Sequence, residues 1–311
     1  MTSLAASPGG VLAIRRDHIL RVEQNELDVQ AVSLYRSSAE TRMKLRGPIL
    51  ALLLLAAPLP ARADQSAPVT VRVLTYNIRH GEGMDRVYDL ARLADIMKAA
   101  EPDLIALQEV DRGTERSGGI DQLDVLADLL GMHGEFGRAI DFQGGQYGVA
   151  ILSRWPLHYP DNQALPASPP YYEPRTALTV FTRAGERGPL IQFTTTHLDD
   201  ARDSPDRMEQ AMALNDLLVA GDGRPSILAG DFNARGEAEL LAILDAHWTN
   251  ITATVPPDAQ GSGGNRRRLR SDFVFFRPAD RWRVVEWRVI DAPLVSDHRP
   301  VLAVLEWTGE S

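Results

Sequence analysis

The run Ser226-Ile227-Leu228-Ala229-Gly230-Asp231-Phe232-Asn233 joins a short apolar segment directly to a carboxylate and an amide. Such a segment predicts a buried β-strand over 226–229 that carries Gly230 and Asp231 at its carboxyl end. Taken alone, the run has a second interpretation, an Asx-type turn that closes the strand, because Gly, Asp and Asn adopt turn conformations easily. Motifs elsewhere in the chain are needed to distinguish a turn from a functional site.

Three further polar motifs accompany strand-like runs, namely Thr75-Tyr76-Asn77, Gln108-Glu109 and Ser296-Asp297-His298. Each has an ordinary interpretation of its own, as a turn former, a solvated strand end or a polar cap before a strand. Together the four motifs are harder to explain as caps, because strands of one sheet present their ends at a common edge. A cleft rich in carboxylates and amides, with one histidine, is what a hard divalent metal ion and a phosphate ester require.

From residue 71 onward, strand and helix patterns alternate, and these patterns predict the elements of a layered domain. Strands are expected at 71–76, 104–107, 148–152, 176–182, 190–196, 226–229, 272–276, 283–290 and 300–307, and helices at 87–101, 122–130, from Ser204-Pro205 onward and at 237–244. Strands 176–182 and 190–196 flank a turn-rich link and predict an antiparallel hairpin. Hairpins mixed with helical crossovers favour a layered α/β or α+β domain over a purely parallel sheet.

Composition limits the classes of function. The 311 residues carry a formal charge of −9, and residues 64–311 alone hold 25 basic and 37 acidic side chains, a net charge of −12. A surface of that sign repels polyanions, so tight non-specific binding to nucleic acid is not expected. The chain has no cysteine, which excludes disulfides, thiolate metal sites and cysteine nucleophiles.

The first 63 residues predict a processing segment. Residues 43–63 combine a basic start, an apolar run too short to span a bilayer, and an Ala-x-Ala cleavage site before Asp64, which is typical of a secretory signal peptide. A buried core helix is disfavoured by Pro48, Pro58 and Pro60, and a signal anchor by the short apolar run. We therefore expect residues 1–42 to be a misassigned or disordered extension and residues 64–311 to form the domain of a periplasmic or secreted protein.

The sequence resembles the endonuclease/exonuclease/phosphatase superfamily of magnesium-dependent phosphoesterases over roughly Val71 to Trp307. Seven blocks in family order carry the resemblance: Thr75-Tyr76-Asn77-Ile78-Arg79, Leu107-Gln108-Glu109-Val110-Asp111, Tyr147-Gly148-Val149-Ala150-Ile151-Leu152-Ser153-Arg154, Thr196-His197-Leu198, Gly230-Asp231-Phe232-Asn233, Asp272-Phe273-Val274-Phe275 and Ser296-Asp297-His298-Arg299-Pro300-Val301. The resemblance implies a four-layer α/β/β/α sandwich of two packed mixed sheets, with the active site at one end of the sheets.

The resemblance also implies a role for each polar residue. Glu109 would be the main ligand of Mg²⁺, with Mn²⁺ as a possible substitute, and Asn77 and Asp297 would lie beside it. The catalytic residues would be His197, Asp231, Asn233, Asp272 and His298. Asp231 and Asn233 would position and deprotonate the attacking water, His197 would donate to the phosphoryl oxygens, and Asp272 would orient His298 against the phosphate.

Two interpretations of Arg175 stand, a phosphate contact made with its planar fork, or an ion pair with Glu173. Arg266-Arg267-Arg268 and Arg270 similarly fit either a second phosphate or a solvated loop. We expect a monomeric hydrolase of phosphate esters, acting on a small organic phosphate, a lipid or, less favoured by the charge, a nucleic acid, with no obligate protein partner. The alternative is a catalytically inactive binding module on the same fold.

Overall fold

The computed structural model describes residues 68–169, 173–201, 205–219, 223–234, 238–251 and 271–309. The predicted signal peptide at 43–63, residues 1–42, Ser204 and the arginines at 266–268 and 270 lie outside these ranges, so their predictions are not tested. None of the helices in the described ranges is long and apolar enough to cross a membrane.

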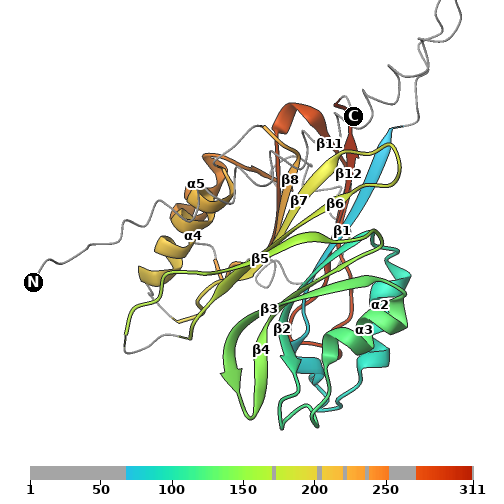
Figure 1. The fold of residues 1–311 in the computed structure, drawn as a ribbon, viewed down its shortest axis with the longest axis vertical. Coiled ribbons are helices and arrows are strands. Elements are labelled where there is room, and N and C mark those ends of the chain that lie inside the picture. The colour runs from blue at the N-terminus through green and yellow to red at the C-terminus, as the bar shows by residue number, and fades with distance from the viewer. Residues whose placement is uncertain are drawn as a thin grey trace, which may run out of the picture. The chain divides into compact units, whose positions relative to one another are not determined.

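Two six-stranded mixed sheets form the centre of the domain (Figure 1). In the first sheet the order is β11 (Trp282–Val289), β12 (Val301–Trp307), β1 (Val69–Asn77), β2 (Leu104–Arg112), β4 (Gly145–Ser153) and β3 (His133–Phe142). In the second it is β5 (His158–Ala164), β6 (Thr176–Arg183), β7 (Leu190–His197), β8 (Ser226–Asp231), β10 (Asp272–Arg277) and β9 (Thr249–Asn250). Each sheet holds one parallel pair, β1 with β2 and β7 with β8, and antiparallel pairs elsewhere.

Helices cover the outer face of each sheet, which gives the predicted four layers. α2 (Leu90–Ala99) and α3 (Gln122–Leu130) pack on the first sheet, and α4 (Pro205–Leu218) and α5 (Ala238–Asp245) pack on the second (Figure 1). Three apolar clusters correspond to the three interfaces, one between the sheets and one under each helix pair. The fold class predicted from the resemblance is therefore confirmed.

Strand alternation explains how the apolar side chains are distributed among these interfaces. Along β8, Ile227 and Ala229 lie in the cluster between the sheets, and Leu228 lies in the cluster under α4 and α5. Successive side chains of a strand point to opposite faces, so Asp231 continues the row that faces the other sheet. The same alternation along β7 and β1 places His197 and Asn77 on the inner side, at the end of the sandwich.

Most predicted elements are present, with two kinds of difference. The first predicted helix is shorter than expected, because Asp89 accepts a hydrogen bond from the Arg92 backbone N–H and caps the helix at Leu90, which leaves Val87 outside it and exposed. The predicted helix at 122–130 is confirmed, ending at Gly131 with a left-handed φ of 64°. Strands β3 and β5 were not predicted, because both are edge strands and neither contains a continuous apolar run.

Candidate active site

The ends of the two parallel strand pairs bring the predicted site residues together from both sheets. In register, Asn77 of β1 lies beside Gln108 of β2, and His197 of β7 lies beside Asp231 of β8. The Asn77 amide nitrogen donates to Asp231 Oδ2 at 3.1 Å across the gap between the sheets. Residues 154 positions apart in the sequence thus share one buried hydrogen bond.

A β-bulge delivers Glu109 to the site. Gln108 faces the other sheet and donates to Thr195 Oγ1 at 3.1 Å, so regular alternation would turn Glu109 outward, toward the helices. The pairing of β2 with β4 shifts between Gln108 and Val110, and Glu109 itself has a φ of 58°. This bulge redirects the Glu109 side chain, whose Oε1 accepts a hydrogen bond from the Asn77 amide nitrogen at 2.9 Å.

Asp231 is the most enclosed carboxylate of the site, with only 1% of its surface exposed. Its Oδ1 accepts from the Asn233 backbone N–H at 3.0 Å, and its Oδ2 lies 3.5 Å from His197 Nε2 and 3.6 Å from His298 Nε2. Burial raises the pKa of Asp231 to about 7, with the nearby Asp272 charge adding to the rise and His298 opposing it. A carboxylate with such a pKa can accept a proton near neutral pH.

His298 is held by Asp272, the residue opposite Asp231 in the pairing of β10 with β8. The Asp272 Oδ2 atom lies 2.8 Å from His298 Nδ1, and Ser271 Oγ donates to the same oxygen at 3.3 Å. Burial alone would lower the pKa of His298, but the charges of Asp272, Asp231 and Asp297 outweigh it and raise that pKa to about 10. His298 is therefore a cation at neutral pH.

His197 has the opposite environment. Its side chain is enclosed beside Arg175, whose Nη1 lies 3.3 Å from His197 Nδ1, and Asn233 Nδ2 lies 3.2 Å from His197 Nε2. Burial, followed by the positive charges of Arg175 and His298, holds the pKa of His197 well below its usual value. His197 is therefore neutral. Arg175 Nη1 lies 2.8 Å from Glu173 Oε1, which is the ion pair that one of the two interpretations of Arg175 stated. The pair is not a surface one on the arginine side, because only 5% of the Arg175 side chain is exposed.

The Ser296-Asp297-His298 segment is tied to strand β1. Ser296 Oγ donates to the Asn77 carbonyl at 2.8 Å and accepts from the His298 backbone N–H at 3.2 Å. Asp297 lies close enough to add to the rise in the pKa of Glu109, for which burial is the main cause. All nine predicted site residues thus contribute to one continuous network at one end of the sandwich.

A comparison with known protein families identifies a family whose matched region contains this network. The family model described as Endonuclease/Exonuclease/phosphatase family matches residues 74–298, which include every candidate site residue. The chain belongs to this family. Members of the endonuclease/exonuclease/phosphatase family are phosphoesterase hydrolases.

Known proteins resemble the chain in sequence and in structure. The uncharacterized protein YbhP of Escherichia coli K12 is 28% identical over 178 residues, which is 55% of this chain and 69% of YbhP. The crystal structure of an endonuclease/exonuclease/phosphatase from Beutenbergia cavernae is similar with a TM-score of 0.64 and 25% identity, over 78% of this chain and 72% of that one. A mannosyl-6-phosphatase of Bacteroides thetaiotaomicron shares the fold, with a TM-score of 0.60 and 18% identity over 76% and 99% of the two chains.

The donor atoms of the site fit a divalent cation, which the endonuclease/exonuclease/phosphatase family generally uses. Four carboxylates, those of Glu109, Asp231, Asp272 and Asp297, converge there, and ligand oxygens of Asp231 and Asp272 lie within 4.8 Å of each other. The Asp272 Oδ1 atom is buried without a hydrogen-bond partner among the described residues. Hard oxygen donors with excess negative charge suit Mg²⁺. Asn77 directs its amide nitrogen at the carboxylates, while its oxygen accepts from the Arg79 backbone N–H at 3.0 Å.

Sequence reasoning missed the layer beneath the site. Gln108 Nε2 donates to Thr75 Oγ1 at 3.3 Å and to Thr195 Oγ1 at 3.1 Å, which links the two sheets directly below the catalytic residues. All three residues are fully buried. The signal available in the sequence was the presence of polar residues at inward positions of otherwise apolar strands, since buried polar groups need partners.

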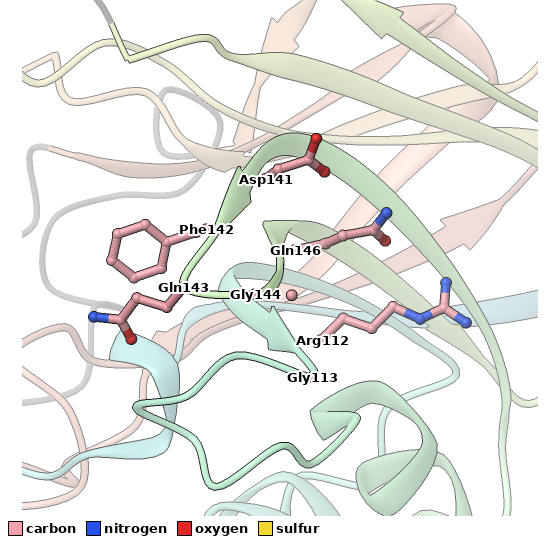
Figure 2. A pocket seen from close by; sticks show the side chains of 8 residues that line it. Arg112, Gly113, Asp141, Phe142, Gln143, Gly144 and Gln146 are labelled. Atoms are coloured by element: carbon pink, nitrogen blue, oxygen red, sulfur yellow. The ribbon is translucent and has the colours of Figure 1, made fainter.

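A surface depression of about 640 Å³ lies elsewhere, between the end of β2 and the β3–β4 turn (Figure 2). Its lining residues are Arg112, Gly113, Asp141, Phe142, Gln143, Gly144, Gly145 and Gln146. Figure 2 shows the Arg112 and Phe142 side chains extending to opposite sides of the turn, so their functional groups do not converge. None of the candidate site residues lines this depression, and we assign it no role in the reaction.

Proposed function

We propose that this chain is a magnesium-dependent hydrolase of phosphate esters that works by direct attack of water. The observation that carries the proposal is the position of Asp231. Its Oδ2 atom is approached by the Asn77 amide at 3.1 Å, by His197 at 3.5 Å and by His298 at 3.6 Å. A buried carboxylate with a pKa near 7, placed beside one neutral and one cationic imidazole, supports general-base catalysis next to an anion-binding centre.

In this proposal each of these residues has a separate role in the reaction. Asp231 takes a proton from a water molecule whose oxygen attacks phosphorus, and Asn233, fixed by its backbone hydrogen bond to Asp231, orients that water. The bond from phosphorus to the leaving oxygen breaks. His298, held by Asp272 and positively charged, donates to a phosphoryl oxygen, and neutral His197 donates a ring N–H to another, where negative charge builds.

Glu109 would hold Mg²⁺, with Asn77 and Asp297 beside it. When bound, the ion would polarise the phosphoryl group and offset charge on the leaving oxygen. The protein's own contribution to this site is the β-bulge at Glu109 and the hydrogen bond from Asn77, which together fix where that carboxylate lies.

Small organic phosphates and lipids are the favoured substrates, because residues 64–311 carry a net charge of −12 that opposes a nucleic acid. The structural similarity to a mannosyl-6-phosphatase is compatible with a small phosphomonoester, although it supports the fold alone. We further propose that the protein is exported by the segment at 43–63 and acts as a monomer in the periplasm or outside the cell. Amino-terminal sequencing of the natural protein tests the export proposal, which predicts a start at Asp64.

The test of function uses residues 64–311, treated with EDTA and then titrated with Mg²⁺ or Mn²⁺. We expect the metal to restore hydrolysis of bis-p-nitrophenyl phosphate, of p-nitrophenyl phosphate, or of both, and the ratio of the two rates separates a diesterase from a monoesterase. Glu109→Ala should raise the metal concentration required, whereas His298→Ala should leave it unchanged and lower turnover. Equal loss of metal affinity in both variants would contradict the assigned roles. No hydrolysis of these esters, phospholipids, sugar phosphates or DNA would favour the binding module.

A further inference from the structure

Arg175 lies just before β6, and its position does not fit a simple substrate contact. Its side chain is 5% exposed, its two terminal nitrogens have partners, and its Nε is buried without a hydrogen-bond partner among the described residues. Nη1 lies 2.8 Å from Glu173 Oε1 and 3.3 Å from His197 Nδ1, and Nη2 lies 3.5 Å from Asp200 Oδ1. The guanidinium thus contacts the back of the His197 ring, on the nitrogen turned away from Asp231.

The chemistry of the two side chains restricts the protonation of His197. A guanidinium has only N–H donors and stays charged at any pH relevant to proteins. A neutral imidazole has one nitrogen that donates and one that accepts. If Arg175 donates to Nδ1, then Nδ1 is the acceptor and the single ring proton sits on Nε2.

We propose that Arg175 is a positioning residue that fixes His197 as the tautomer carrying its proton on Nε2, the nitrogen that faces Asp231. The charge at the other end of the ring agrees with this assignment, because Asp231 Oδ2 lies 3.5 Å from Nε2, where its negative charge favours a proton on that nitrogen. In this tautomer Nε2–H lies on the side of the carboxylate that serves as the base, and so on the side of the phosphoryl group of a substrate. The catalytic consequence rests on the proposed function, whereas the tautomer does not.

Asn233 provides the competing arrangement. Its amide nitrogen lies 3.2 Å from His197 Nε2 and donates to the Leu198 carbonyl at 3.0 Å. If Asn233 also donated to Nε2, the ring proton would move to Nδ1 and point at the guanidinium, which brings two donors, one of them charged, against each other. The cation at Nδ1 and the carboxylate at Nε2 therefore outweigh the neutral amide.

The test is long-range ¹H–¹⁵N NMR of the histidine rings in the metal-free protein, with the His197 signals identified by their loss in His197→Gln. In the unsubstituted protein we expect Nδ1 to show the shift of an unprotonated nitrogen and Nε2 that of a protonated one. Arg175→Met should give a mixture of tautomers, Arg175→Lys should restore the Nε2–H form at least in part, and Asn233→Ala should leave it unchanged. An Nδ1–H tautomer in the unsubstituted protein, or a pure Nε2–H form in a folded Arg175→Met variant, would overturn the proposal.

Steady-state kinetics give a second measurement on the same variants. Because Arg175 acts through His197, Arg175→Met should lower kcat by roughly two- to tenfold, in proportion to the fraction of His197 that loses the Nε2–H form, and should change KM little. If Arg175 bound the substrate directly, Arg175→Met would raise KM instead. That result would also overturn the proposal. Arg283→Met on β11, which removes an exposed pair with Glu306 of β12, is the matched control and should leave both measurements unchanged. If no phosphate ester is hydrolysed at all, the proposed function fails, and the NMR result still decides the role of Arg175.

Discussion

His197 and His298 approach the same atom, Asp231 Oδ2, at 3.5 and 3.6 Å, yet their surroundings drive their charges in opposite directions. His197 ends a strand of the second sheet and has a cation, Arg175, behind its ring. His298 follows a loop of the first sheet and has a carboxylate, Asp272, behind its ring. Burial lowers the pKa of both rings, and the difference between them is that nearby carboxylates, Asp272 behind the ring above all, outweigh burial at His298, whereas Arg175 adds to it at His197.

The largest expected effect comes from removing the carboxylate that both histidines share. Asp231→Asn leaves the shape of the side chain nearly unchanged but removes the base, so kcat for a phosphate ester should fall by roughly 10³-fold. The pKa of His298 should fall as well, because one of the charges that raise it is gone. Asp128→Asn, on the exposed side of α3, makes the same chemical change and should leave turnover intact. A loss smaller than about tenfold in Asp231→Asn would show that Asp231 is not the base.

Asp272→Asn removes the carboxylate behind the His298 ring and leaves Arg175 behind the His197 ring. The pKa of His298 should drop from about 10 toward its ordinary value, and kcat at pH 8 should fall by roughly 10²-fold because less of the imidazole is charged and the ring is no longer fixed. An NMR titration of the histidine rings measures the shift directly. His133, exposed at the start of β3, serves as the internal control. An unchanged His298 titration would mean that Asp272 does not set its charge.

The inward face of each central strand could be predicted from alternation, and with it much of the site. Asn77, His197 and Asp231 each take the next inward position after buried residues of the core between the sheets, so a period of two places them correctly. Glu109 does not follow this rule. A regular strand would turn it toward the helices, and only the bulge at 108–110 brings it to Asn77. Nothing local in the sequence marks that bulge, and the motif resemblance alone supplied Glu109.

The partner of His298 was predicted from the sequence, whereas the partner of His197 was not. Asp272 was assigned to His298 through the family pattern, and the structure places the two side chains 2.8 Å apart. Arg175 was considered only as a phosphate contact or a partner of Glu173, and its place behind His197 was not predicted. The contact depends on how the segment before β6 packs against the end of β7, a tertiary arrangement that sequence periodicity does not encode.

The pH dependence of stability should follow from the same two groups. In metal-free protein, Asp231 keeps its proton up to a pKa of about 7 when folded, against 3.8 when unfolded, so the folded state binds more protons between these values and stability falls as pH rises from about 4 to 7. The pKa of His298 is raised from 6.5 to about 10, so its stabilising contribution is complete below pH 6.5 and is lost as pH rises through 10.

Urea unfolding between pH 4 and 10 measures this dependence, which should amount to a few kcal/mol in total. Asp231→Asn should abolish the lower window and Asp272→Asn should shrink the upper one. Addition of Mg²⁺ should stabilise the unsubstituted protein most at high pH, where the carboxylates are ionised. A stability that rises with pH across both windows would contradict both assignments.

The smallest effect should come from Ser296→Ala, which tests whether the histidines also differ in how they are held. His197 belongs to a regular strand, whereas His298 depends on the Ser296 hydroxyl, which donates to the Asn77 carbonyl at 2.8 Å and accepts from the His298 backbone N–H at 3.2 Å. Removing this hydroxyl leaves a buried carbonyl without that donor and should cost about 1–2 kcal/mol of unfolding free energy. The His298 ring signals should shift or broaden while those of His197 stay in place. Equal changes in both rings would show that the two sheets move as one unit and that the loop has no separate role.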